Sequence, residues 1–227
     1  MTSSSFEPGT GSASADPGFE GMFGSFTITA ADRREVLHYR LALLALAMAQ
    51  LGLVLQAWLL GPRLLWPWLL PMLAGLGLAL RWIHIYLIPL HRSLQLLWLL
   101  GCLGFAALAL RAGPNGMAEA VLMDGRWIWA IGPFFAALAG VGFKEFFCFR
   151  RPEAIGVTLL LPIALLGHLS GLLDPAACGA MLALQALLLL VLCLRKLPMP
   201  AAADIGDKSV FVYLQQQRQA SGARQSA

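Results

Sequence analysis

Charged side chains are scarce in this 227-residue chain. They make up 12% of the residues, against roughly 25% in an ordinary soluble domain. Hydrophobic residues make up 59%, which is more than one water-soluble core of this size can enclose. Several apolar runs are 17 to 20 residues long, and such a run matches a hydrocarbon layer of about 30 Å at 1.5 Å per residue. The composition therefore excludes an ordinary soluble protein and indicates an integral membrane protein.

The sequence also lacks the motifs of several enzyme classes. It has no Gly-rich phosphate loop, no HExxH zinc motif and no GxSxG nucleophile elbow. No two of its four cysteines have CxxC spacing, which favours their packing as small apolar side chains. These cysteines are Cys102, Cys148, Cys178 and Cys193. The sequence assigns no catalytic residue, and it leaves a cofactor or metal open.

The apolar runs predict an all-α, polytopic bundle with about six membrane spans. The second span is the least regular, because residues 64–92 would form a helix of about 43 Å, too long for a simple crossing. We divide this stretch into a Pro-containing span and an interfacial segment at 81–92, whose Trp, Tyr, His and Arg side chains suit the headgroup region. The predicted spans are 41–60, 64–80, 93–110, 127–143, 154–173 and 178–194.

The loop charges give this arrangement a direction. Cytoplasmic loops carry an excess of Lys and Arg, and the two sets of alternate loops differ, with eleven basic residues near span ends against three. The charges therefore favour both termini on the cytoplasmic side, and they account for the net charge of +4 without a nucleic-acid partner. The eleven are Arg33, Arg34, Arg40, Arg81, Arg92, Lys144, Arg150, Arg151, Arg195, Lys196 and Lys208, and the three are Arg63, Arg111 and Arg126.

The two ends of the chain have a different composition. Residues 1–28 are polar and Gly/Ser-rich, without a basic start or an apolar stretch, and we predict a disordered tail rather than a cleavable signal peptide. The transmembrane domain is expected at 29–196, with Thr29 as the N-cap of its first helix. Residues 197–227 are expected to form a cytoplasmic tail that contains a short strand at 209–214.

Six ionisable side chains form a predicted polar cluster near the cytoplasmic interface. Ionisable groups at membrane depth are costly and therefore mark candidate functional sites. The histidines admit a metal or haem site, with His38 as a further haem ligand, or a plain role as interfacial anchors. The six residues are His84, His91, Lys144, Glu145, Cys148 and Glu153.

Glu145 is the member hardest to explain without a partner, because phenylalanines surround it in the sequence. It needs a nearby cation or it takes up a proton, and the expected cations are Arg81, Arg92 and Arg150. Lys144 is the next residue on the same helix and points about 100° away, so no pair between Lys144 and Glu145 is expected. A structural ion pair is the leading role for Glu145, and proton or cation handling is the alternative.

His168 is a candidate polar residue within the membrane. It lies six residues before Asp174, or roughly 9 Å inside the outer end of its span. Together with Ser170 it invites a comparison with rhomboid proteases, but the sequence has no Gly-x-Ser-Gly and no histidine in the sixth span. A hydrogen bond from His168 to a backbone carbonyl or to Asp174 is the expected role.

Residues 142–149 and 83–91 carry a family resemblance, with the sequences GFKEFFCF and IHIYLIPLH. There the chain resembles an uncharacterised family of multi-pass membrane proteins that is found mainly in cyanobacteria and has only a domain-of-unknown-function label. The resemblance implies one unit over about residues 30–215 in a cyanobacterial cytoplasmic or thylakoid membrane. It implies no activity, cofactor or site residue.

Two classes of function remain open. One is a non-enzymatic scaffold or assembly factor for a membrane complex, favoured by the lack of a catalytic constellation and by a C-terminal tail that can dock. The other is a small transporter or a cofactor-binding membrane protein that handles protons, a metal or haem. An enzyme that acts on lipid comes third, and the lipid bilayer is the one partner that the composition predicts.

Overall fold

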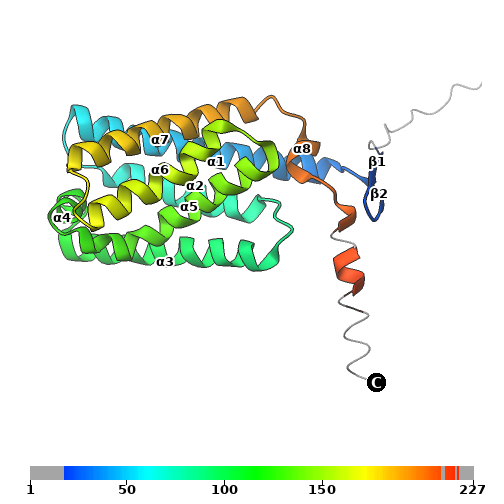
Figure 1. The fold of residues 1–227 in the computed structure, drawn as a ribbon, viewed down its shortest axis with the longest axis horizontal. Helices are drawn as coiled ribbons and strands as arrows, with labels where there is room; N and C mark the ends of the chain where they lie inside the picture. The colour runs from blue at the N-terminus through cyan, green and yellow to red at the C-terminus, as the bar shows by residue number, and fades with distance from the viewer. Residues whose placement is uncertain (1–17, 211–212, 218, 220–227) are drawn as a thin grey trace, which may run out of the picture.

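The computed structural model describes residues 18–210, 213–217 and 219. Within these residues the fold is almost entirely α-helical, as predicted, and its long helices lie side by side in one elongated bundle (Figure 1). The long helices are α1 (Ala30–Leu59), α2 (Trp66–Trp82), α3 (Ile88–Ala112), α5 (Ile128–Phe149), α6 (Pro152–Leu169) and α7 (Pro175–Lys196). The short elements are β1 (Gly18–Gly21), β2 (Gly24–Thr27), α4 (Met117–Met123), the 3₁₀ helix η1 (Gly125–Trp127) and α8 (Ala201–Ile205).

The long helices pack in a ring in the order α2, α1, α7, α6, α5, α3. The contact between α2 and α3 closes the ring and is the least extensive of these. Trp98 of α3 lies in this seam, where its indole N–H donates to the carbonyl oxygen of Leu73 at 2.9 Å. Fully buried side chains from all six long helices form the core, among them Leu46, Leu76, Leu108, Phe134, Leu161 and Leu189.

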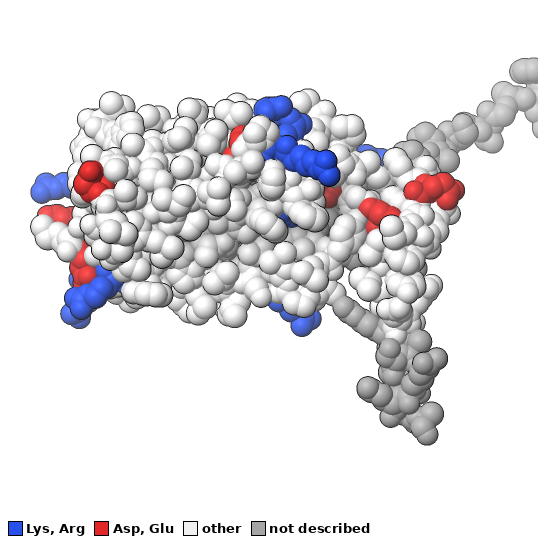
Figure 2. All heavy atoms as spheres, viewed as in Figure 1, with Lys and Arg blue, Asp and Glu red and all other residues white. Residues whose placement is uncertain are grey.

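The ring has two chemically different ends. One, the charged end, holds the start of α1 and the ends of α5 and α7, with Arg40, Lys144 and Lys196. The other, the loop end, holds residues 60–65 and 111–127, with Arg63, Arg111 and Arg126. Figure 2 shows a broad uncharged middle between the two ends on the face in view. The helices thus separate the two groups of basic residues that the loop pattern distinguished.

Five of the described helices, α1, α3, α5, α6 and α7, are long and apolar enough to cross a membrane. α2 has 17 residues, or about 25 Å as a helix, and it packs along α1 over most of the predicted second span. The predicted interfacial segment at 81–92 is divided: its first two residues end α2, residues 83–87 form a non-helical connection, and the rest begins α3.

The chain segments before α1 and after α7 fold against each other at the charged end. β1 and β2 form an antiparallel hairpin. The Asp207 carboxylate accepts a hydrogen bond from the Met22 amide at 2.7 Å, and the Ser209 hydroxyl accepts one from the Phe23 amide at 3.0 Å. A small apolar cluster lies beneath, formed by Ile28, Val36 and Ile205. We call β1, β2, α8 and residues 206–209 the terminal module.

The described residues differ from two predictions about the tails and confirm the predicted cap of α1. Residues 18–27 form the hairpin instead of a disordered tail, while residues 1–17 lie outside the described residues. The predicted strand at 209–214 is helical at Ser209, Val210 and Tyr213, in keeping with the helix-forming Leu and Gln that follow. Thr29 caps α1 as predicted, and it exchanges hydrogen bonds with Asp32 in a capping box.

Gly104 allows α3 to approach α5 closely. A Cβ atom at this position would lie 1.9 Å from the carbonyl oxygen of Ala130, so Gly104→Ala is expected to cost about 1–3 kcal/mol through overpacking. The control is Gly132→Ala on α5, where the nearest atom would be 3.6 Å away. Thermal unfolding in detergent should show a clear loss for Gly104→Ala and no loss for Gly132→Ala, and equal unfolding temperatures would contradict the close contact.

Candidate functional site

A buried group of charged side chains lies inside the charged end of the ring. It comprises residues from α1, α5, α7 and α8, so four separate parts of the chain meet there. All of its members, one tyrosine and five charged residues, are less than 10% exposed. We call the group the ion cluster, and its members are Tyr39, Arg40, Lys144, Glu145, Lys196 and Asp204.

Glu145 is the centre of the ion cluster and is fully buried. Its Oε1 accepts hydrogen bonds from the Tyr39 hydroxyl at 2.6 Å and from Lys144 Nζ at 3.2 Å. Its Oε2 is paired with Lys196 Nζ. Both carboxylate oxygens therefore have charged partners, which is the condition under which a buried carboxylate is tolerated.

Asp204 joins α8 to the same cluster. Its Oδ1 lies 2.5 Å from Lys196 Nζ, and its Oδ2 accepts from Arg40 Nη2 at 2.6 Å and from Arg40 Nε at 2.8 Å. Lys196 therefore bridges Glu145 and Asp204. The described side chains form one continuous chain of ion pairs from α5 through α7 and α8 to α1.

Arg40 also donates hydrogen bonds to the backbone of the segment that follows α7. Its Nη1 donates to the carbonyl oxygens of Met199 at 2.6 Å and Leu197 at 3.2 Å, and its Nη2 donates to that of Pro200 at 3.2 Å. The last carbonyls of a helix have no partner within the helix and carry partial negative charge. Arg40 thus neutralises the end of α7 and fixes the turn into α8.

The ion cluster contains three cations and two carboxylates. Two kinds of interaction offset the extra positive charge, one with a helix dipole and one with aromatic rings. Lys196 lies in the last turn of α7, where the helix dipole favours cations. Lys196 Nζ also lies 4.0 Å from the centre of the Phe149 ring and 5.4 Å from that of Tyr39, within the range of cation–π attraction.

The structure corrects the predicted partners of Glu145. The expected cations Arg81, Arg92 and Arg150 are not its partners, and Lys144, which was not expected to pair, lies 3.2 Å from Oε1. Backbone directions 100° apart do not prevent this contact, because the long lysine side chain bends back toward the ring interior. The expectation that Glu145 needs a cationic partner is consistent with the geometry.

The other four members of the predicted polar cluster are not drawn together with Glu145. Glu153 is paired with Arg195 at 3.0 Å, and His84 Nε2 lies 3.7 Å from Glu35 Oε2. His91 Nε2 lies 2.7 Å from the carbonyl oxygen of Leu80, and Cys148 is an exposed free thiol. Among the described residues no group of three or more His, Cys, Asp or Glu side chains is arranged to hold a metal ion.

His168 has the role expected of it. Its Nε2 lies 2.9 Å from the carbonyl oxygen of Val121, so the side chain ties α6 to α4 at the loop end. His38, considered as a haem ligand, packs on the Trp82 ring with a centroid distance of 4.8 Å.

The sequence did not predict the place of four members in the ion cluster, namely Tyr39, Arg40, Lys196 and Asp204. The three charged ones were treated as loop charges or tail residues, because a single sequence does not show which side chains turn inward. One signal was available for Asp204, which is an isolated carboxylate in an otherwise uncharged stretch at 197–206.

A second polar layer lies deeper in the bundle. Gln50 of α1 and Gln185 of α7 are almost fully buried and joined by a side-chain hydrogen bond. Gln185 lies eleven residues before Lys196, or about 16 Å along the helix, and the buried side chains between them include Leu189, Leu192 and Cys193. A layer of apolar side chains therefore separates the two polar layers, and the described side chains provide no hydrogen-bonded path through it.

His84 gives a pH dependence that can be measured. Burial lowers the pKa of its imidazole below the usual value of 6.5, and Glu35 opposes this only in part. Below about pH 6.5 the unfolded chain therefore binds a proton that the folded protein resists. Stability should fall as the pH drops from 7 to 5, and the slope should be smaller in His84→Asn. Thermal unfolding across this pH range tests the direction of the change in stability. A wild type that becomes more stable on acidification, while His84→Asn does not, would contradict it.

The fold, with its long apolar helices, agrees with a comparison to known families. The sequence profile of a family described as "Uncharacterized integral membrane protein (DUF2301)" matches residues 78–213, or 136 of the 227 residues. The chain belongs to the DUF2301 family. The matched segment contains Lys144, Glu145, Lys196 and Asp204, while their partners Tyr39 and Arg40 precede it. Comparisons with curated proteins and with solved structures give no match.

Proposed function

We propose that this DUF2301 protein is a non-enzymatic membrane scaffold or assembly factor that presents the terminal module to a membrane complex. The observation that supports this most is the closure of the ion cluster. Its charged groups are directed at one another and at the backbone of the α7–α8 turn, and they hold the module on the bundle. Such an arrangement suits a rigid docking platform better than a reaction centre.

The proposed topology places the platform in the cytoplasm. With α2 as a sixth crossing, both ends of the chain lie on one side, and the excess of Lys and Arg assigns that side to the cytoplasm. We propose a bacterial cytoplasmic membrane or a cyanobacterial thylakoid membrane as its location. Cysteine labelling from the two sides of sealed vesicles, at single cysteines introduced at Arg63 and Arg111, tests the direction.

The experiment for the scaffold role compares two matched variants. Asp207→Ala/Ser209→Ala removes the hydrogen bonds to the hairpin amides, and Asp124→Ala breaks the exposed pair with Arg126 at the loop end. After cross-linking in native membranes, partners bound by the wild type should be lost from the first variant and kept by the second. Retention of the same partners by both variants would contradict a role for the terminal module.

The alternative is a transporter or a protein that handles protons, a metal or haem. It requires buried charges that change partners during the cycle, and the layer of apolar side chains between the ion cluster and the Gln50–Gln185 pair opposes a proton path. In vesicles loaded with a pH-sensitive dye, the scaffold predicts no proton flux above that of empty vesicles. A flux that disappears in His84→Ala would favour the alternative.

A further inference from the structure

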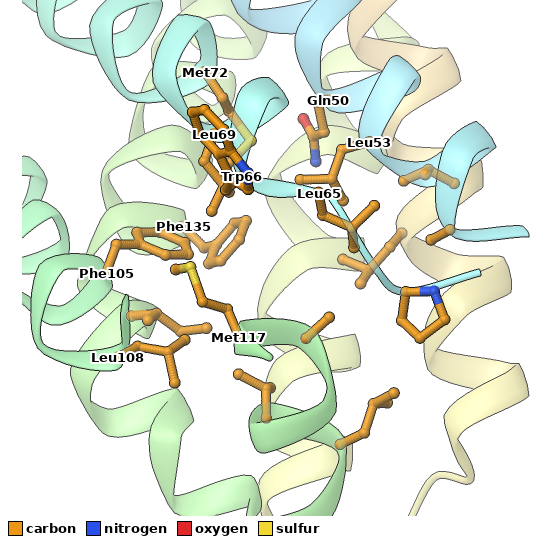
Figure 3. A pocket seen from close by; sticks show the side chains of 18 of the residues that line it. Gln50, Leu53, Leu65, Trp66, Leu69, Met72, Phe105, Leu108, Met117 and Phe135 are labelled. Carbon is orange, nitrogen blue, oxygen red and sulfur yellow. The ribbon is translucent and has the colours of Figure 1, made fainter. Parts of the chain in front are cut away.

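A cavity of about 280 Å³ lies inside the loop end of the bundle, beyond the Gln50–Gln185 pair. Its walls come from all six long helices, with one residue each from α6 and α7, and α4 with the turn before α2 covers it. Figure 3 shows Trp66, Phe105, Met117 and Phe135 around the space, with the Gln50 side chain at its inner margin. This space belongs neither to the ion cluster nor to the terminal module.

The size and lining of the cavity define what fits it. Small-molecule sites usually measure about 300–1,000 Å³, and an engineered apolar cavity of about 150 Å³ binds benzene. The space is therefore large enough for roughly ten to twelve carbon atoms. Among its described lining residues Gln50 is the one with a side-chain amide, and almost all the others are aliphatic, aromatic, proline or methionine side chains.

Gln50 provides the buried polar side chain of the site, since Trp66, whose indole N–H is also polar, is an exposed residue of the lining. Gln50 is 3% exposed, and its Nε2 donates a hydrogen bond to Gln185 Oε1. Its own Oε1 has no hydrogen-bond partner among the described residues. A buried polar atom without a partner is costly. Exchanging the oxygen and nitrogen of both amides preserves their mutual bond and leaves a donor free instead. A hydroxyl group can both donate and accept, so it satisfies Gln50 in either orientation.

The cavity can be entered from the surface at the loop end. Four of its lining residues lie at or next to helix ends and are exposed, namely Pro62, Trp66, Pro114 and Leu122. A molecule dissolved in the bilayer near its interface can therefore reach the space without crossing the bundle.

We propose that this cavity binds a small apolar alcohol of roughly ten to twelve carbon atoms, with its hydroxyl group bonded to Gln50. The hydroxyl distinguishes this ligand from the acyl chains of the surrounding lipid, which end in a methyl group. The inference does not depend on the proposed scaffold role.

The test uses the full-length protein in phospholipid vesicles and 1-decanol with a diazirine on its chain. After illumination, mass spectrometry identifies the labelled peptides, and unlabelled 1-decanol or decane competes at equal concentration in the membrane. We expect labels on α4 and on residues 62–72, and competition by 1-decanol at about tenfold lower concentration than by decane, since a buried hydrogen bond has that effect.

Two kinds of variant distinguish the contribution of the hydroxyl contact to binding from that of the cavity's shape. Gln50→Leu/Gln185→Leu removes both amides together, so labelling should persist while the tenfold preference for the alcohol disappears. Ala118→Trp fills the cavity and should abolish the labelling, and Val121→Phe serves the same purpose if Ala118→Trp does not fold. Unfolding temperatures near that of the wild type confirm that the variants are intact.

Labelling that no competitor reduces, or that survives in a folded cavity-filling variant, would show only partition into the bilayer and would overturn the proposal. Equal competition by decane and 1-decanol in the wild type would overturn the assignment of Gln50.

Discussion

Replacing Glu145 with leucine is expected to destabilise the bundle by about 3–5 kcal/mol. The substitution leaves the buried ammonium groups of Lys144 and Lys196 without their shared carboxylate, and it leaves the Tyr39 hydroxyl without its acceptor. Thermal or denaturant unfolding in detergent should show a large loss. A change below about 1 kcal/mol, which is typical of exposed pairs, would contradict the buried geometry.

The matched control removes the two lysine ammonium groups together with the carboxylate. In Glu145→Leu/Lys144→Met/Lys196→Met, the Arg40–Asp204 pair remains, although Asp204 loses its contact with Lys196 and the Tyr39 hydroxyl still lacks its acceptor. Replacing a whole buried ion group with apolar side chains of similar volume is often neutral or stabilising. The triple variant should therefore recover most of the stability lost in Glu145→Leu. A triple variant as unstable as the single variant would show that uncompensated charge is not the cause.

Arg40→Met is expected to release the C-terminal segment from the bundle. Arg40 holds three backbone carbonyls after α7 as well as Asp204, so its loss leaves several buried acceptors unpaired, at a cost of about 3–5 kcal/mol for the broken pair. Because Arg40 joins α1 both to α8 and to the turn before it, local detachment of this segment should precede global unfolding.

Limited proteolysis measures that release. Residues 197–210 should be cleaved much faster in Arg40→Met than in the wild type, with the bundle left intact. Arg33→Met is the control, because Arg33 lies about two helical turns before Arg40 and donates to the backbone of Ile28, outside the α7–α8 turn. Equal cleavage rates in Arg40→Met and the wild type would show that other contacts hold the segment.

The sequence predicted the features that depend on local composition. Apolar runs of membrane length located α1, α3, α5, α6 and α7, and the Thr29 cap followed from its residue type and place. The Pro-containing second stretch also formed a helix, although its end at Trp82 and the connection at 83–87 required the structure.

The ion cluster could not be predicted in full, because its contacts join residues far apart in the sequence. Arg40 and Asp204 are separated by 164 positions, and the amide of Met22 meets Asp207 across 185. Residue spacing on one helix says nothing about such contacts. The same reason explains the hairpin at 18–27, since its partner segment, which contains Asp207 and Ser209, lies near the other end of the chain.

The most direct test of the account returns the triple variant Glu145→Leu/Lys144→Met/Lys196→Met to cells that lack the native protein. If the ion cluster acts only as an anchor for the terminal module, the variant should insert, protect residues 197–210 from protease and retain the wild-type cross-linked partners. A triple variant that is folded and protected but loses those partners, or fails to restore the function lost in the deletion strain, would show that the charges themselves act in the protein's chemistry.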